Sequence, residues 1–352
     1  MTTMRAAVLH GAENVQIEHL PVPGVGPGEV RVKIAAALTC GTDAKVYRRG
    51  YHAKMIRPPA VFGHEFAGVV EALGDGTVAC ADGALAQGDL VVAANSAPCG
   101  QCFHCVRGQE SMCEDLLFLN GAYAEYITIP ARIVSRNLWR VPRGLPAEVA
   151  ALSEPLACCV KGIEDTGVKA GETVVVLGLG PIGLMMVALA AARGARVLAV
   201  GRRAARLAAA AAMGAAQTLD EAACDDLSDT IADLTDGRGA DRVVECVGLP
   251  SAWEQAISLT RRGGVCNLFG GCPAGSEVSI DCTRLHYDEL TLLGSFHHTP
   301  RHIKEALDLL ATGAIPADQL INDRIGLADV PDALRRMGGR GHLIKAAVDV
   351  TG

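Results

Sequence analysis

Cysteine spacing gives the clearest chemical signal in this chain. Cys99, Cys102, Cys105 and Cys113 follow one another closely, and the first three stand at consecutive C-x-x-C spacings. Four thiolates at such spacing can close a tetrahedral shell around one zinc ion. A shell of four protein ligands leaves no position for a substrate, so we expect loop 99–113 to hold a structural zinc. His104, which lies inside the loop, is expected not to be a ligand.

A second set of residues has the composition of an open metal site. Cys40 follows a strand-like segment, His64 and Glu65 are adjacent, and Glu154 stands in Ser-Glu-Pro farther along the chain. One thiolate, one imidazole and one carboxylate leave zinc a position for water or substrate, as catalytic sites require. Taken singly, these residues are weak support, because a lone cysteine or histidine usually belongs to a core. The alternatives Glu65 and Glu154 for the carboxylate ligand stay open.

A glycine-rich segment predicts a nucleotide site. Gly178, Gly180 and Gly183 fit G-x-G-x-x-G, with Pro181 and Ile182 between the last two. The motif follows a run of valines and opens an apolar helix, which is the context it requires. The glycines permit a tight turn, close approach of the backbone to a pyrophosphate and close helix–strand packing, and the helix N-terminus offers N–H groups to the phosphates. We expect these five residues to bind a dinucleotide.

The end of the next strand predicts which dinucleotide is bound. An acidic residue there would bind the adenosine ribose of NAD, but the strand RVLAV ends in Gly201, Arg202 and Arg203. A glycine leaves room for a 2′-phosphate, and a guanidinium can bind it in a bidentate manner. We therefore expect NADP(H) to be favoured over NAD(H). The alternative is two solvated arginines at a helix start, where the helix dipole disfavours cations. Val247, after the strand RVVEC, is a further candidate for cofactor binding.

Two kinds of element must position these residues. Up to about residue 155 the chain is rich in short β-branched runs, such as 30–34, 67–71 and 89–93, bounded by Gly or Pro. From about 171 to 295, apolar strands alternate with alanine-rich helical stretches, which is typical of a doubly wound parallel sheet. The tail HLIKAAVDV has strand character and is expected to return to the first domain. The fold class predicted is α/β, a Rossmann sheet joined to a β-rich domain.

Composition excludes several other classes of protein. The formal net charge of −7 argues against a nucleic-acid binder, which would normally carry a basic stripe. The N-terminus lacks the pattern of a signal peptide, and the longest apolar run, 184–192, is far shorter than a membrane span. Thirteen cysteines in a chain with ample core are expected to be metal ligands or small buried hydrophobes. We expect a cytoplasmic protein that binds neither nucleic acid nor membrane.

Taken together, these segments resemble the zinc-containing medium-chain dehydrogenase/reductase family. The resemblance covers almost the whole chain: CGTD at 40–43, GHEFAGVV at 63–70, the loop 99–113, GAYAEY at 121–126, SEPLA at 153–157 and GLGPIG at 178–183. Within the family the chain is most similar to sorbitol (polyol) and L-threonine 3-dehydrogenases. VGRR at 200–203 is similar to the 2′-phosphate segment of NADP-dependent secondary alcohol dehydrogenases. The resemblance implies a GroES-like catalytic domain, 1–156 with 296–352, a Rossmann domain, 157–295, and an active site in the cleft between them.

The resemblance also implies residue roles. Cys40 and His64, with Glu65 or Glu154, would hold the catalytic zinc, giving two zinc ions per chain. Thr42 matches the hydroxyl that hydrogen-bonds the substrate alcohol and passes its proton onward. Where the family usually has a histidine, five residues after the cysteine, this chain has Lys45. A lysine is a poor base near neutral pH unless its pKa is lowered. His52 is an alternative relay residue, and a surface position would explain it equally well.

The implied reaction is hydride transfer between a secondary alcohol and NAD(P). The donor-rich segment 46–57 is compatible with a polyhydroxylated substrate, and a site for an anionic group or a solvated loop would explain the same residues. Ranked by the resemblance, polyol, cyclitol or sugar-derived substrates come first, threonine-type amino alcohols second and simple secondary alcohols third. Residues 296–299 are candidates for the cofactor site or a subunit interface, and relatives suggest a homodimer or homotetramer. The competing hypotheses are a non-catalytic NADP(H) sensor with the same fold and a zinc-ribbon interaction module fused to a Rossmann domain. About two zincs per chain would favour the enzyme, and one would favour its rivals.

Overall fold

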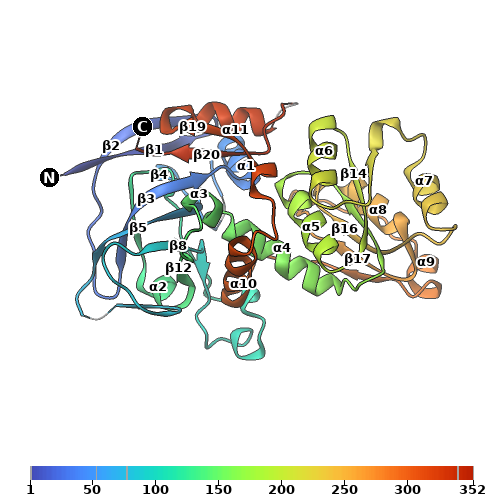
Figure 1. Ribbon diagram of the computed structural model, residues 1–352, viewed down its shortest axis with the longest axis horizontal. Coiled ribbons are helices and arrows are strands. Elements are labelled where there is room, and N and C mark those ends of the chain that lie inside the picture. The colour runs from blue at the N-terminus through green and yellow to red at the C-terminus, as the bar shows by residue number, and fades with distance from the viewer. Residues whose placement is uncertain (1, 53, 77, 339–340, 352) are drawn as a thin grey trace. The chain divides into compact units, whose positions relative to one another are not determined.

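The computed structural model describes residues 2–52, 54–76, 78–338 and 341–351 (Figure 1). The chain divides into two units. The first contains Met1–Ala157, His298–Gly313 and Ile321–Gly352, and the second contains Cys158–His297 and Ala314–Leu320. Helix α4 (Ser153–Thr166) runs through the boundary. The sequence-based domain boundaries stay a prediction beside this division.

The first unit is mainly β-structure with short helices. Its strands are β1 (Thr3–Gly11), β2 (Asn14–Pro21), β3 (Val30–Leu38), β4 (Ala60–Val61), β5 (Glu65–Leu73), β6 (Ala79–Cys80), β7 (Gly83–Ala84), β8 (Leu90–Ala93), β9 (Ser96–Ala97), β10 (Leu117–Phe118), β11 (Tyr126–Ile129), β12 (Leu138–Arg140), β19 (Ile321–Gly326) and β20 (Lys345–Asp349). Its helices are α1 (Gly41–Arg49), α2 (Ala131–Asn137), α3 (Ala147–Ala150), α10 (Pro300–Ala311) and α11 (Val330–Gly338), with 3₁₀ turns η1 (Cys105–Arg107), η2 (Glu110–Met112) and η5 (Leu327–Asp329).

Strand β3 organises the main sheet of this unit. The strand order is β12-β8-β5-β3-β20-β19, and β11 also pairs with β3. Alternate β3 side chains such as Val30, Val32 and Ile34 are buried in the core, as expected for a strand with one face on a core. The C-terminal strand β20 pairs antiparallel with β3, and α11 packs on α1, so the two ends of the chain meet in one unit (Figure 1). The predicted runs 30–34, 67–71 and 89–93 lie in β3, β5 and β8.

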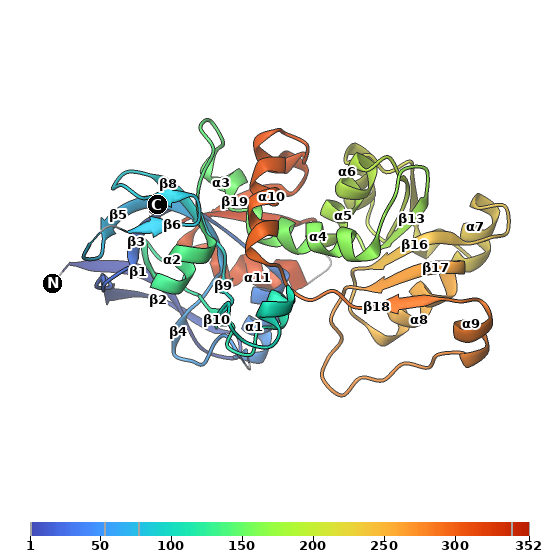
Figure 2. The ribbon, with the colours of Figure 1, turned by 90° about the horizontal axis from the view of Figure 1, so that it is seen from below.

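The second unit is a six-stranded parallel sheet with helices. Its strands are β13 (Thr173–Leu177), β14 (Arg196–Gly201), β15 (Gln217–Asp220), β16 (Ala240–Glu245), β17 (Thr260–Leu268) and β18 (Thr291–Leu293). Its helices are α5 (Pro181–Ala192), α6 (Ala204–Ala212), α7 (Leu227–Leu234), α8 (Pro250–Leu259) and α9 (Cys282–Tyr287), with 3₁₀ turns η3 (Glu221–Ala223) and η4 (Ala317–Gln319). The strand order is β15-β14-β13-β16-β17-β18, and Figure 2 shows β17 beside β18 at one edge.

The order of these strands fixes where a ligand can bind. The chain goes from β13 to β14 and β15 on one side, and then returns to β16 on the other side of β13. In open parallel sheets, ligands bind at the carboxyl ends of the strands where the order reverses. Helix α5 begins there, and its residues Gly183–Ala190 are all buried, as a helix apolar on every side should be. The predicted doubly wound sheet is confirmed.

Two local features of this unit do not follow from the sequence pattern. Helix α8 ends at Leu259, inside the helix-like segment SAWEQAISLTRRG, because Thr260 already pairs with Ala240 as the first residue of β17. Strand β15 was not predicted from its four residues; it exists because Leu219 and its neighbours pair with β14. In the part of the chain that the structure describes, every helix is too short or too polar to cross a lipid bilayer.

Candidate active site and zinc centres

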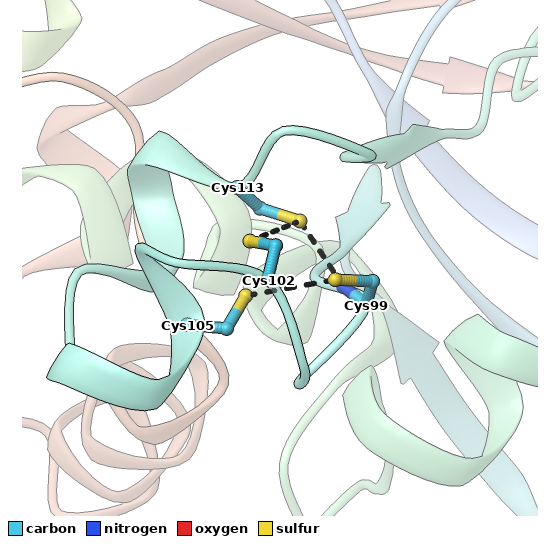
Figure 3. Close-up of side chains that lie close together, drawn as sticks. All are labelled: Cys99, Cys102, Cys105 and Cys113. Atoms are coloured by element: carbon cyan, nitrogen blue, oxygen red, sulfur yellow. Dashed lines mark hydrogen bonds between the residues drawn. The ribbon is translucent and has the colours of Figure 1, made fainter.

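The four predicted cysteines converge on one point. Their sulfur atoms all lie within 4.8 Å of one another, and Figure 3 shows the side chains pointing inward from a loop closed by the pairing of β9 with β10. The sulfurs of Cys99 and Cys105 are 4.0 Å apart, and those of Cys102 and Cys113 are 3.9 Å apart. A tetrahedron with metal–sulfur bonds of about 2.3 Å has edges of about 3.8 Å. The donor set therefore fits a zinc ion.

The protonation of the loop agrees with this fit. All four cysteines have free thiols, and backbone N–H groups of Glu114 and Cys105 lower the pKa of Cys102 to about 6. Burial acts in the opposite direction on Cys105 and raises its pKa. At least one sulfur is thus available as a thiolate near neutral pH, which is the form that binds metal. His104 contacts Gln109 (3.1 Å), and the group of converging ligand atoms consists of the four sulfurs.

The structure also brings together Cys40, His64 and Glu65. One ligand atom from each lies within 4.8 Å of the others. The reason is strand register. Leu38 at the end of β3 pairs with Glu65 at the start of β5, and Cys40, the N-cap of α1, follows Leu38 by two residues. His64 and Glu65 are buried, and Cys40 is half-buried. A thiol, an imidazole and a carboxylate thus meet where β3 ends and β5 begins, in the middle of the strand order of the first unit's sheet.

A buried carboxylate orients the imidazole. Asp43 Oδ1 accepts a hydrogen bond from His64 Nδ1 (3.0 Å), and Asp43 Oδ2 lies 2.6 Å from the Tyr123 hydroxyl. Because Nδ1 is engaged, Nε2 is the ring nitrogen left for a metal, as in the carboxylate–histidine–zinc arrangement. Burial alone would lower the pKa of His64, but the negative charges of Asp43 and Cys40 raise it well above 6.5. Burial and Asp43 raise the pKa of Tyr123, so its hydroxyl stays a donor.

Gly63 is required by the same arrangement. Its φ is +91°, and an added Cβ would lie 2.8 Å from the ring of Tyr123. Side chains rarely adopt this backbone conformation, and the ring leaves no space for one. The glycine before His64 therefore lets the chain turn against Tyr123, whose ring also packs edge-on against Phe62.

Glu65 has a partner from the far end of the chain. Lys345 Nζ donates to Glu65 Oε2 and to the backbone oxygen of Thr39 (2.7 Å), and both charged groups are buried. The pairing of β20 with β3 sets Lys345 beside Thr39. Burial raises the pKa of Glu65 despite the ammonium, and the carboxylate raises the pKa of Lys345 despite burial. Glu65 Oε1 is buried with no hydrogen-bond partner among the described residues, which leaves an oxygen that fits a metal ligand.

Glu154 lies near this group without being part of it. Its Oε1 is 3.6 Å from Nε2 of His298, which belongs to the same unit. His298 Nε2 also contacts Asn95 Oδ1 (3.1 Å). The charge of Glu154 still acts on Glu65, where it raises the pKa. Of the two carboxylates that the sequence left open, the geometry sets Glu65 beside Cys40 and His64.

The relay candidates occupy different surroundings. Thr42 is half-buried in the first turn of α1, and its N–H donates to Cys40 Sγ (3.4 Å). Lys45 is exposed on the same helix. His52 lies in a tight loop held by hydrogen bonds with Ile56, and its Nδ1 accepts from the backbone of Lys54 and Met55. Burial and then the charge of His64 lower the pKa of His52, so its imidazole is neutral near pH 7.

The glycine motif of the second unit has the predicted geometry. Gly178 follows β13 with φ of +97°, and Gly180 precedes α5. A Cβ at Gly183 would lie 1.8 Å from the backbone oxygen of Gly178, so only glycine lets the helix approach the strand this closely. A Cβ at Gly180 would meet open space. The first and third glycines are thus required for packing, and the second leaves the helix N-terminus accessible.

A cavity of about 510 Å³ adjoins this turn. Its lining includes Gly178, Gly201, Arg202, Arg203 and Val247, all predicted to bind the cofactor, and also Arg206 and Glu221, which were not predicted. A Cβ at Gly201 would lie 2.8 Å from the end of the Leu179 side chain, so a larger residue here would displace Leu179. The position and lining fit the adenosine end of a dinucleotide bound at a glycine turn.

Sequence reasoning missed the residues that support the site rather than form it. Asp43 and Tyr123 stand in the quoted motifs CGTD and GAYAEY, but no role was assigned to them. Lys345 was not identified, because a single lysine in a strand-like segment is usually a surface residue. Arg206 lies in the first turn of α6, just after the N-cap Arg203, and its nearness in sequence to Arg202 and Arg203 could have identified it.

Comparison with known proteins agrees with this geometry. Residues 26–142 match the model of the alcohol dehydrogenase GroES-like domain, and residues 181–312 match that of the zinc-binding dehydrogenases. The chain is 38% identical to L-threonine 3-dehydrogenase of Bacillus licheniformis over 91% of both chains. It is 32% identical to sorbitol dehydrogenase of Bacillus subtilis over 95% of this chain and 93% of that one.

A solved structure resembles this chain over nearly the full length of both proteins. A protein of Sinorhizobium meliloti 1021, described as a zinc-binding dehydrogenase bound to NADP, superimposes with a TM-score of 0.89 at 33% identity, covering 99% of each chain. The predicted family, the fold of a Rossmann sheet with a GroES-like domain, and the enzyme class are confirmed. Because two domain models and relatives aligned over more than nine-tenths of its length agree, the chain belongs to the zinc-binding dehydrogenases, oxidoreductases that act on alcohols.

Proposed function

We propose that this protein transfers a hydride between a secondary alcohol of a polyol, cyclitol or sugar-derived substrate and NADP(H), using two zinc ions per chain. The observation that carries the proposal is the meeting of Cys40, His64 and Glu65, with His64 fixed by Asp43. Three ligands of these types leave a metal one position for a substrate oxygen. Cys99, Cys102, Cys105 and Cys113 would hold the second, structural ion.

The residues would divide the work as follows. When bound, zinc supplies Lewis-acid polarisation of the substrate oxygen, and the nicotinamide accepts or returns the hydride. Cys40, His64 Nε2 and Glu65 Oε1 hold the metal, while Asp43 keeps the proton on His64 Nδ1. Lys345 balances the buried charge of Glu65.

Proton transfer would begin at Thr42, whose hydroxyl takes the proton of the substrate hydroxyl. Lys45 and His52 remain the two candidates for the next step. The lowered pKa keeps the His52 imidazole neutral near pH 7, so it can accept a proton, but its Nδ1 already accepts two backbone N–H groups. Lys45 is exposed and could instead donate to a ribose hydroxyl.

Cofactor preference is inferred from the second unit. The cavity beside the glycine turn contains three arginines, and a carboxylate in the position that binds the ribose of NAD is replaced by Gly201. NADP in the Sinorhizobium meliloti protein supports the same preference. A threonine-type amino alcohol is the second candidate substrate, supported by 38% identity to L-threonine 3-dehydrogenase. A cytoplasmic location and a homodimer or homotetramer stay predictions.

The test is a panel of polyols, cyclitols, aminopolyols, threonine and simple secondary alcohols, each assayed with NAD and NADP. We expect the fastest turnover with a polyhydroxylated substrate and NADP. The same preparation should contain about two zincs per chain. In His64→Ala we expect one zinc and no turnover in a protein that is still folded by circular dichroism. Retained turnover in that variant would refute the assignment of the catalytic site.

A further inference from the structure

The segment between two of the proposed metal-site residues concentrates positive charge. From residue 44 to residue 64 the chain has no acidic residue. The same segment contains five cations, which we call the basic cluster: Lys45, Arg48, Arg49, Lys54 and Arg57. The first three belong to α1, the other two belong to the loop that follows it, and all five are exposed. In a chain with a formal net charge of −7, this segment can attract a negative ligand.

The basic cluster lacks the ion pairs that other exposed arginines of this chain form. Arg262 and Arg324, for example, each pair with a carboxylate. Within the part of the chain that the structure describes, no carboxylate pairs with a member of the basic cluster. The dipole of α1 favours cations in its last turn, where Arg48 and Arg49 lie, but it does not account for the two cations of the loop. An external anion would supply the partner that the chain does not.

Helix α1 connects the basic cluster to the proposed catalytic residues. Cys40 is the N-cap of the helix, and Thr42, Lys45 and Arg49 lie on one side of it, because they are three and seven residues apart. At 1.5 Å per residue, Arg49 lies about 10 Å along the helix axis from Thr42. The Cα–Cβ bonds of a helix tilt toward its N-terminus, which here is the end that carries Thr42. Positive charge therefore follows the proposed catalytic hydroxyl along one side of the helix.

Hydrogen bonds hold the loop after α1 against the same site. Asn120 Nδ2 donates to the backbone oxygen of Met55 (3.2 Å). The N–H of the next residue, Gly121, donates to the backbone oxygen of Gly63 (2.9 Å), and Gly63 directly precedes His64. One short segment thus contacts both the loop and the turn that positions the imidazole.

The surroundings of His52 also place the basic cluster beside the metal site. Burial, and then the charges of His64, Arg49 and Lys54, lower the pKa of the His52 imidazole. Charges act strongly on a pKa only when they lie nearby. A cation from the helix and a cation from the loop are therefore both close to an imidazole that also senses His64.

We infer that the basic cluster binds an anionic group, phosphate or carboxylate, carried by the hydroxylated substrate, with Arg49 and Lys54 as its main contacts; this rests on the proposed function. A guanidinium binds either anion through charge-assisted hydrogen bonds, which are the strong ones. Lys45 and Arg49 are like charges at i, i+4 spacing, which is unfavourable in a free helix. An anion beside them would offset that repulsion.

The experiment compares neutral and anionic forms of the same substrate skeleton, using the full-length, zinc-loaded enzyme and NADP. The sets are sorbitol with sorbitol 6-phosphate and gluconate, ribitol with ribitol 5-phosphate and ribonate, and myo-inositol with inositol 1-phosphate. In the set with the fastest turnover we expect kcat/KM to be at least about 10-fold higher for an anionic member than for the neutral one. The phosphate and carboxylate members show which anion is bound. The preference should shrink as salt is raised.

Variants locate the preference on the basic cluster. Arg49→Met and Lys54→Met should each lower kcat/KM for the anionic members about 10-fold more than for the neutral ones, mainly through KM, and Arg49→Lys should retain most of the preference. Lys45 stays unchanged because it is a candidate for the proton relay. Arg143→Met is the matched control, since Arg143 is exposed in the same unit, after β12, and has no ion pair among the described residues. It should leave the preference unchanged.

The possible results separate this inference from the proposed function. If the enzyme oxidises the neutral members with NADP but gains nothing from an anionic group, the basic cluster is a solvated surface and only this inference is overturned. The same holds if the anionic preference exists but R49M/K54M, still folded by thermal unfolding, keeps it. If no member of any set is turned over, the proposed function fails, and this inference fails with it.

Discussion

Replacement of Asp43 tests how the catalytic metal site is built. Asp43→Asn keeps the shape of the side chain and removes its charge. In the structure the amide oxygen of Asn can still accept from His64 Nδ1, and its NH₂ group can donate to the Tyr123 hydroxyl. That hydroxyl can then donate to the backbone oxygen of Leu38, which is 3.1 Å away. We therefore expect Asp43→Asn to fold and to keep the orientation of the imidazole.

The charge is what this variant loses. A buried carboxylate that accepts from a metal-binding histidine raises the basicity of the ligand, and its loss typically costs 10- to 100-fold in metal affinity. That factor corresponds to about 1.4–2.7 kcal/mol. Asp43→Ala goes further, because the buried His64 N–H loses its acceptor, at about 1–3 kcal/mol, whereas the Tyr123 hydroxyl can still donate to the backbone oxygen of Leu38. We expect Asp43→Ala to be less stable than Asp43→Asn by about 1–3 kcal/mol.

The assay is zinc content by mass spectrometry after dialysis against graded chelator, combined with urea unfolding of each variant. The four-cysteine loop gives an internal control, because its zinc should survive the same chelator range in all three proteins. We expect one of the two zincs of Asp43→Asn to be lost at about 10- to 100-fold lower chelator than in wild type. Equal zinc retention in Asp43→Asn and wild type would show that the charge of Asp43 does not support the metal.

Three further predictions concern stability. Lys345→Met leaves the buried carboxylate of Glu65 without its ammonium and should lower the free energy of unfolding by about 3–5 kcal/mol, and the double variant K345M/E65Q should recover part of this loss in urea titrations. Gly63→Ala forces an unfavourable φ and a clash with the Tyr123 ring, so it should lower the melting temperature more than Gly171→Ala, where φ is also positive (+80°) but the space around the added Cβ is open. Equal shifts in melting temperature would show that the clash has no effect. Burial raises the pKa of the Glu245 carboxyl above 4.5 in the folded protein. The free energy of unfolding of wild type should therefore fall, relative to that of Glu245→Gln, as pH rises from about 4.5 through the folded-state pKa. Parallel curves of unfolding free energy against pH for the two proteins would contradict this prediction.

Local patterns determined much of the second unit and the four-cysteine loop. The glycine turn depends on residues 178–183, and its strand and helix are adjacent in the chain, so spacing alone describes the geometry. The same holds for Cys99 to Cys113, which a short loop brings together. At the end of α8 the sequence pattern still favours a helix, but Thr260 already belongs to strand β17. There the pairing of β17 with β16 outweighs helix propensity.

The sequence by itself thus determined the ligand types and the family: thiols at metal-binding spacing, a Cys-His-Glu set and a dinucleotide turn. Only tertiary structure decided which groups meet. Strand register sets Glu65, rather than Glu154, beside Cys40 and His64, and it brings Lys345 to Glu65 from 280 residues away. Asp43 in α1 and Tyr123 in the segment before β11 likewise meet across 80 residues. The physical reason is that a chain pattern encodes contacts within a turn or helix, whereas buried pairing of distant charges depends on how strands align.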